Sequence, residues 1–219
     1  MRRILLLCGV LSPLLYAVAD ALAGLRSEGY SFRDQTISEL GAIGASSRPL
    51  FSILLIPVYL LLPAFGVGVW RSAGGSRGLR VAGGLLVGLG VLALTVGQLV
   101  PMRPRGTGQG LAGALHLAEG AVAMLVLVVA MGFATTAFGS RFRLYTLATM
   151  ALILAFAAWS ALKAPRIVAG LPTPWVGVEE RIFWYGYQFW FVVLAVTLLR
   201  QQAPDRTRGE DHAPAPAKL

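Results

Sequence analysis

The chain has 219 residues, of which 56% are hydrophobic and 13% charged, and its formal net charge is +9. Charged residues make up about a quarter of a soluble globular domain, so this composition excludes that class and indicates a polytopic membrane protein. The positive charge does not indicate nucleic-acid binding, because the arginines lie in short segments between apolar runs, where they set membrane orientation. Cys8 is the only cysteine, which excludes an internal disulfide and a cysteine-cluster metal site.

Six apolar runs are long enough to cross a hydrocarbon core of about 30 Å, which takes about 20 residues of helix. The sequence therefore predicts an all-α membrane bundle of six transmembrane helices that forms a single domain over residues 1–200. The predicted spans cover residues 4–25, 50–70, 81–100, 112–138, 142–162 and 182–199. Residues 201–219 are rich in proline, alanine and charge and lack apolar periodicity, so they are predicted to form a disordered cytoplasmic tail.

The first apolar run also allows a different interpretation. The N-terminal segment has the features of a secretory signal with a small-residue cleavage site. It contains Arg2-Arg3, an apolar stretch and Ala21-Leu22-Ala23 before Gly24. A membrane span is the preferred interpretation, because residues 4–25 are long enough to cross and bring the number of helices to an even six. Cleavage of residues 1–23 as a signal peptide stays an alternative.

The first connection contains a polar, glycine-punctuated stretch over residues 33–48. Thr36 followed by Glu39 has the form of a capping box, in which each side chain satisfies a backbone N–H of the other. We therefore expect a short helix from Thr36 to Leu40 outside the bilayer, ended by Gly41. The next helix is expected to begin at residues that cap or tolerate a first turn, Ser46 or Ser47 and then Pro49. The stretch fits either a well-capped connector or a functional loop.

Glycine and proline give packing predictions for the second and third runs. Gly84 and Gly88 form a small-xxx-small pair that lets a neighbouring backbone approach closely. Other glycines follow along the same predicted helix: Gly83, Gly90 and Gly97. Pro57 and Pro63 interrupt the second run, where each removes a backbone hydrogen bond and tends to kink the helix. Such breaks often border cavities, so a cavity beside this helix is one of the possibilities.

Orientation follows from the distribution of arginine and lysine. With a cytoplasmic N-terminus, the inner segments hold eleven of these residues and the outer segments eight. The short inner turns at residues 71–80 and 139–143 carry arginines and no acid, and short loops weigh most in setting orientation. We therefore predict a multi-pass protein of the cytoplasmic membrane with both ends inside.

Ionisable residues inside the predicted spans form a polar layer in the outer leaflet. Asp20 lies five residues before the outer end of its span, about 7 to 8 Å below that surface. His116 and Glu119 lie one turn apart on one helix face at a comparable depth. Further polar groups are expected near this level: Gln98, Ser160, Tyr185 and Gln188. Because a carboxylate in the bilayer costs on the order of 2.5 to 3.5 kcal/mol, both acids are expected to face inward and find partners.

The simplest arrangement pairs a protonated His116 with Asp20 or Glu119. It fits an interhelical polar clamp, or a binding or catalytic pocket that opens outward. A metal site is disfavoured, because the other histidine, His212, lies in the tail and no known ligand spacing occurs. We expect no metal and no cofactor. No nucleophile motif is present, and Ser38 beside Glu39 would qualify only with His116 in reach.

Several of these residues support a family comparison. The chain resembles the membrane family catalogued as domain of unknown function 998 over about residues 4–200. The resemblance rests on the first apolar run and on Arg33-Asp34, Thr36-Ile37-Ser38-Glu39-Leu40-Gly41, Arg48, Phe51, Pro101, His116, Glu180-Arg181-Ile182 and Trp190. It implies six helices in a bacterial or archaeal membrane and no activity, because the family is uncharacterised.

The chain departs from the family in its third loop. Family members often carry an acidic residue after the proline of this loop, whereas this chain has Met102-Arg103-Pro104-Arg105. If that acid works with the histidine in other members, Glu119 is the residue here that would substitute for it.

Two classes of function follow from these observations. In the first, the protein binds or moves a lipid or small molecule through the outer polar cluster, and Arg33 and Arg48 contact a headgroup phosphate. The loop residues expected to bind the ligand are Arg33, Asp34, Ser38, Glu39 and Arg48. Membrane lipids are then the expected partners, nucleic acid is not, and the oligomeric state stays open.

The alternative is an intramembrane enzyme of the hydrolase or transferase type that acts at the outer leaflet. His116 would be its general acid or base, oriented by Asp20 or Glu119. Glu39 is the fourth catalytic candidate.

Overall fold

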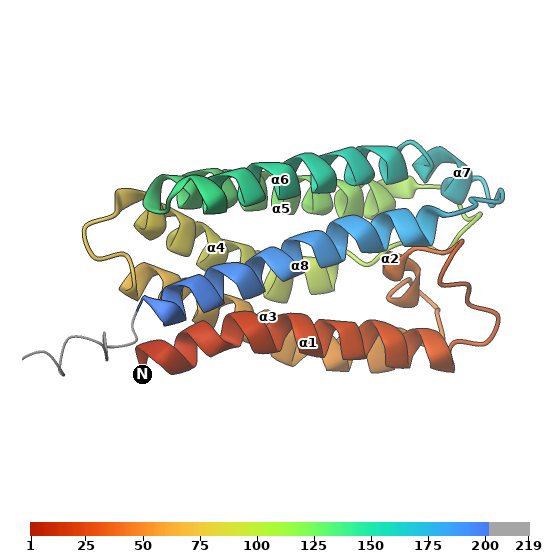
Figure 1. The fold of residues 1–219 in the computed structure, drawn as a ribbon. Coiled ribbons are helices and arrows are strands. Elements are labelled where there is room, and N and C mark those ends of the chain that lie inside the picture. Colours follow the sequence, from red (N-terminus) through yellow and green to blue (C-terminus); the bar gives the residue numbers. More distant parts are fainter. Residues whose placement is uncertain (202–219) are drawn as a thin grey trace, which may run out of the picture.

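Six long antiparallel helices form the computed structural model of the chain, which describes residues 1–201 (Figure 1). The long helices are α1 (Arg2–Arg26), α3 (Arg48–Arg71), α4 (Arg77–Leu99), α5 (Gly110–Ala134), α6 (Ser140–Ala161) and α8 (Val176–Arg200). The short elements are α2 (Ile37–Leu40), a 3-10 turn (Thr135–Ala137) and α7 (Ala164–Val168). Six helices of the described chain are long and apolar enough to cross a membrane, which confirms the predicted all-α bundle.

Three connections gather at one end of the bundle, and we call them together the cap. The cap consists of residues 27–47, which contain α2, residues 100–109, and residues 162–175, which contain α7. The N-terminus and the end of α8 lie at the opposite end (Figure 1). The short connections at that opposite end are residues 72–76, between α3 and α4, and residues 135–139, between α5 and α6.

Helix boundaries differ most from prediction where polar residues lie at a helix start. Helix α8 begins at Val176, six residues before the predicted start, because Glu179 and Glu180 lower the local hydropathy and yet are buried. Helix α5 begins at Gly110 and gives way to the 3-10 turn after Ala134. The predicted disordered tail lies outside the described residues, apart from residue 201.

The core follows from the packing order of the helices. Helix α3 packs against α1 and α4, α4 also packs against α5, and α8 packs against α1 and α6. Large side chains of α3 and α8 meet in the centre, where Phe65, Trp190 and Phe191 are almost fully buried. Helix α1 thereby packs against both α3 and α8.

Close backbone approach between α3 and α4 uses different glycines from the predicted pair. A methyl group on Gly83 would lie 2.6 Å from the backbone nitrogen of Trp70 and 2.8 Å from the carbonyl oxygen of Gly66. Gly84 and Gly88 face open space, where a methyl group would have nothing within 4 Å. The prediction of close approach along this helix is therefore confirmed, but its assignment to Gly84 and Gly88 is wrong. The two faces differ by one residue of rotation, about 100°.

The two prolines of α3 lie inside a continuous helix, Arg48–Arg71. Gly90 of α4 lies against the ring of Pro63, and a side chain at this position would collide with that ring. The absence of a side chain at Gly90 thus accommodates Pro63 between the two helices.

The predicted capping box of α2 is confirmed. The Thr36 hydroxyl accepts a hydrogen bond from Glu39 N at 3.3 Å, and the Glu39 carboxylate accepts one from Thr36 N at 2.8 Å. Gly41 follows the last helical residue, as expected. The hydroxyl of Ser47 does not cap α3 but donates to Leu40 O at 2.9 Å, so it ties the start of α3 to the end of α2.

Candidate functional site

Asp20 of α1 has its charge compensated inside the bundle. Arg181 of α8 makes a bidentate ion pair with it. The guanidinium Nη2 donates to Oδ1 at 2.7 Å, and Nε donates to Oδ2 at 2.9 Å. The Tyr185 hydroxyl donates to Oδ2 at 2.7 Å. The guanidinium also donates to Phe32 O and lies 4.8 Å from the centre of the Phe32 ring. A buried carboxylate with a bidentate partner and a further donor is a well-satisfied clamp between α1 and α8.

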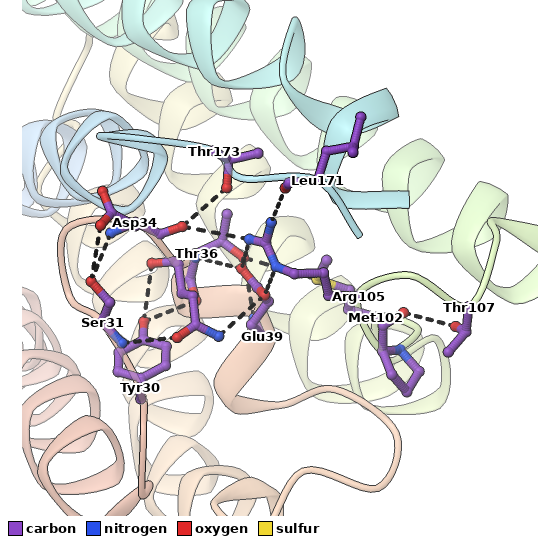
Figure 2. Close-up of polar contacts among 12 residues, drawn as sticks. Tyr30, Ser31, Asp34, Thr36, Glu39, Met102, Arg105, Thr107, Leu171 and Thr173 are labelled. Atoms are coloured by element: carbon purple, nitrogen blue, oxygen red, sulfur yellow. Dashed lines mark hydrogen bonds and ion pairs between the residues drawn. The ribbon is translucent and has the colours of Figure 1, made fainter. Parts of the chain in front are cut away.

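Glu39 and Arg105 make a second buried pair that joins all three segments of the cap (Figure 2). Arg105 donates from Nε and Nη2 to the two carboxylate oxygens, at 2.8 and 2.9 Å. Its Nη1 donates to Leu171 O of the third segment at 3.0 Å. Thr173 adds a hydrogen bond to Asp34 O at 3.0 Å. Glu39 thus has a structural partner, and this carboxylate is not available as a free base.

The two glutamates at the start of α8 are also engaged. Glu180 accepts hydrogen bonds from Ile37 N and from the Ser38 hydroxyl, the latter at 3.0 Å. Glu179 pairs with Lys163 of the third cap segment. The Ser38 hydroxyl therefore donates to the Glu180 carboxylate and not to His116.

Three of the predicted ligand-binding residues lie at the surface of the cap or near it. Arg33 and Asp34 pair with each other at 2.8 Å, and Arg33 lies 5.5 Å from the centre of the Trp175 ring. Hydrogen bonding to Arg33 lowers the pKa of the Asp34 carboxyl and raises the pKa of the Arg33 guanidinium. The side chain of Arg48, at the start of α3, has no hydrogen bond or ion pair to any residue of the described range. Arg48 is therefore the member of this set whose charge is not matched inside the cap.

His116 of α5 is bonded to the backbone. Its Nδ1 lies 2.9 Å from Val100 O, and because a carbonyl only accepts, Nδ1 carries the proton. In the neutral ring Nε2 is then free to accept a proton. Neither Asp20 nor Glu119 is hydrogen-bonded to His116 in the structure of residues 1–201. His116 thus has a free Nε2, and no serine, threonine or cysteine side chain of residues 1–201 is hydrogen-bonded to it.

Glu119, one turn beyond His116 on α5, is half-buried. One carboxylate oxygen lies beside Gly97 of α4, 3.5 Å from where a methyl group on that glycine would be. Within residues 1–201, the carboxylate of Glu119 makes no hydrogen bond and no ion pair. Among the acids inside the bundle, Glu119 thus differs from Asp20 and Glu180 in lacking a donor.

Glu119 belongs to a set of polar groups from four helices, which we call the mid-depth layer: Tyr16, Tyr59, Glu119 and Tyr187. Each lies nine to eleven residues from the cap end of its helix, about 14 to 17 Å along the helix axis. Tyr16 is the most deeply buried of the three tyrosines, at 2% exposed. None of the three tyrosine hydroxyls has a hydrogen-bond partner in the described part of the chain.

Aromatic contacts hold this layer in place. The rings of Tyr16 and Trp184 stack with centroids 5.4 Å apart and planes 12° apart. Trp184 also contacts Tyr187, with centroids 5.2 Å apart. Aromatic stacking therefore joins helices α1 and α8 at this depth.

Sequence reasoning found the acids but missed several of their partners. Arg181 and Arg105 follow the acids they bind by 161 and 66 residues, so no local pattern indicates either pair. Tyr59 and Tyr187 lie in apolar runs and were missed as part of a polar layer. Both lie eleven residues from the cap ends of the observed helices, but nine and five residues from the predicted starts, so the predicted boundaries concealed their common depth.

Comparison with known families gives one match. The family model described as "Protein of unknown function (DUF998)" matches residues 10–197. No curated protein and no solved structure matches the chain.

Proposed function

This chain belongs to the DUF998 family of proteins of unknown function, and we propose that it binds or moves a lipid or small molecule within the cap-side half of the bundle. The ligand contacts the mid-depth layer, with Glu119 as its principal polar partner. The cap closes this half of the bundle at the membrane surface.

One observation carries the proposal, the unmatched carboxylate of Glu119. A carboxylate within a membrane-spanning helix costs on the order of 2.5 to 3.5 kcal/mol and is normally paired. Asp20, Glu39, Glu179 and Glu180 all have cations or hydrogen-bond donors in contact. Glu119 has neither within residues 1–201, so a ligand is the partner that offsets its burial.

The positions of neighbouring groups suit a ligand that enters from the cap. His116 lies one turn nearer the cap than Glu119 on the same face of α5, with Nε2 free to bind. Tyr59 of α3 and Tyr187 of α8 lie at a similar depth, and their hydroxyls can each donate or accept a hydrogen bond. A ligand at this depth would meet aromatic side chains and a few polar groups, a combination common in ligand sites.

We further propose that the cap faces the outside of the cytoplasmic membrane. The connections at the opposite end are flanked by arginines and contain no acid, which favours the inner side. The flanking arginines are Arg71, Arg77, Arg80, Arg141 and Arg143. In the cap, Arg33, Arg105 and Lys163 are paired with acids, whereas Arg103 and Arg166 donate to backbone carbonyls.

Native mass spectrometry of the protein, purified in a maltoside detergent, tests the binding proposal. Wild type should carry a discrete bound mass that is lost in Glu119→Gln, because the amide has nearly the same shape without the charge. Arg33→Gln is the matched control, since it changes the cap loop and leaves the mid-depth layer intact. A bound mass retained in Glu119→Gln and lost in Arg33→Gln would overturn the proposal in favour of the loop. Wild type without any bound mass would also contradict it.

A further inference from the structure

We propose that a cavity at the end of the bundle opposite the cap binds the phosphate group of an anionic lipid. The cavity has a volume of about 190 Å³ and is lined by Arg2, Ser72, Leu198 and Gln201. This site is separate from the one at Glu119, because the two lie in opposite halves of the bundle. The charge at this end, the donors of the cavity and its level in the membrane support the proposal.

The end opposite the cap carries a strong excess of positive charge, and we call it the basic end. Arg2, Arg3 and Arg200 lie there, together with the arginines that flank its short connections. Each acid of residues 1–201 lies in the cap or in the cap-side half of its helix, so none lies at the basic end. This end therefore attracts anions, as juxtamembrane basic segments attract anionic lipids.

The cavity lies where the ends of three helices come together. Arg2 is the first residue of α1, Ser72 follows the last residue of α3, and Leu198 and Gln201 lie at the end of α8. Helix α1 packs against both α3 and α8, which brings these ends close to one another. The space greatly exceeds the ~10 to 15 Å³ that one water molecule requires, so it can hold a tetrahedral oxyanion.

The polar side chains of the cavity can donate hydrogen bonds to such an anion. Within residues 1–201, the guanidinium of Arg2 makes no hydrogen bond and no ion pair, so its charge is available to a ligand. A guanidinium binds two phosphate oxygens at once, and the Gln201 amide supplies further N–H groups. The Ser72 hydroxyl donates to Gly68 O at 2.7 Å, so it lines the cavity without contributing a donor. Arg2 is therefore expected to be the principal partner of the phosphate.

The surroundings of the cavity fit a lipid better than a soluble phosphate. Trp70, near the end of α3, is 54% exposed, and exposed tryptophan is typical of the headgroup level of a membrane. Ser72 follows Trp70 by two residues, so the cavity lies at this level. Exposed apolar side chains continue from it along one face of α1, at Ile4, Leu7, Leu11, Leu14 and Val18. A lipid can thus place its phosphate in the cavity and its acyl chains along α1.

Titration of lipids into the full chain in a maltoside detergent, followed by native mass spectrometry, tests the proposal. The probes are phosphatidylglycerol, which is anionic, and phosphatidylcholine with the same acyl chains, whose ammonium group offsets its phosphate. Wild type should bind the first molecule of phosphatidylglycerol about tenfold more tightly. Arg2→Gln should lose about that factor, because it removes the guanidinium of the cavity. Gln201→Leu, which removes the amide and keeps a similar size, should lose about threefold.

Arg141→Gln is the matched control, since it removes the same charge from the basic end at an exposed position that does not line the cavity. It should weaken the binding of phosphatidylglycerol by less than about twofold, because solvent screens distant exposed charges. Equal affinity of wild type for the two lipids would overturn the proposal. Equal losses in Arg2→Gln and Arg141→Gln would also overturn it, in favour of a diffuse attraction without a site.

Glycerophosphoglycerol, the same headgroup without acyl chains, separates a lipid from a soluble phosphate ester. The lipid should bind at least about tenfold more tightly in the same titration, because its chains add apolar contact with α1. Equal affinity for the two molecules would overturn the assignment to a lipid. Glu119→Gln should leave the binding of phosphatidylglycerol unchanged, and a loss in this variant equal to that in Arg2→Gln would contradict a separate site.

Discussion

Replacing Asp20 by asparagine should destabilise the bundle strongly, because it removes one charge of a buried pair and leaves the other. The side chains of Asp20 and Arg181 are 4% and 14% exposed, so solvent screens this pair little. Breaking a buried pair costs about 3 to 5 kcal/mol. Asparagine still accepts from Tyr185, which places the expected loss near the lower limit. At about 2 to 4 °C per kcal/mol for a chain of this size, Tm should fall by about 6 to 12 °C.

The assay is thermal unfolding in a maltoside detergent, followed by tryptophan fluorescence. Arg33→Gln is the control, since it breaks an ion pair whose arginine side chain is 60% exposed and should change Tm little. The double variant Asp20→Asn with Arg181→Gln should lose less than the sum of the two single losses, because the two residues are coupled. Equal Tm values for Asp20→Asn and Arg33→Gln would refute the reasoning that burial makes this pair important.

Three further predictions test packing, pH dependence and orientation. Gly83→Ala should cost about 1 to 3 kcal/mol of stability through overpacking against α3, whereas Gly84→Ala, which faces open space, should be neutral or stabilising in the same thermal assay. The pKa of Asp34 is lower in the folded state than its unfolded-state value of about 3.9. Its ionised form therefore stabilises the fold at pH values above about 3.9, and this stabilisation is lost as the pH falls through the folded-state pKa. The Tm difference between wild type and Asp34→Asn should therefore shrink below about pH 4, and a difference that grows would contradict the assignment. In a Cys8→Ser background, a cysteine at the exposed cap position Ser46 should react with an impermeant maleimide in intact cells. A cysteine at Ser140 should react only after permeabilisation. The reverse pattern would show the opposite orientation.

The helices and the local structure of the cap could be predicted from the sequence, because their causes are local. Apolar length defines the six long helices, and the capping box of Thr36 and Glu39 depends on residues three positions apart. Helix α8 began earlier than predicted because the burial of Glu180 depends on Ile37 N and Ser38, which are distant in the sequence.

The pairings of the site could not be predicted, because they depend on how the helices rotate about their axes. The sequence placed Asp20, His116 and Glu119 at a similar level, but in the structure Asp20 binds Arg181 and His116 binds a backbone carbonyl. The same limit applies to Gly83 and Gly84, where one residue of rotation decides which glycine contacts α3. The depth of a residue along its helix can thus be predicted from the sequence, whereas the residue that it contacts on another helix cannot.

Chemical labelling of carboxyl groups tests most directly whether Glu119 is the unmatched, ligand-accessible acid of the bundle. A hydrophobic carbodiimide adds covalently to protonated carboxyl groups that it can reach within the membrane, and peptide mass spectrometry identifies the modified residue. We predict modification at Glu119 and little at Asp20 or Glu180, with labelling of Glu119 suppressed by the bound ligand. Modification of Asp20 or Glu180 in preference to Glu119, or labelling of Glu119 that no bound ligand reduces, would contradict the account.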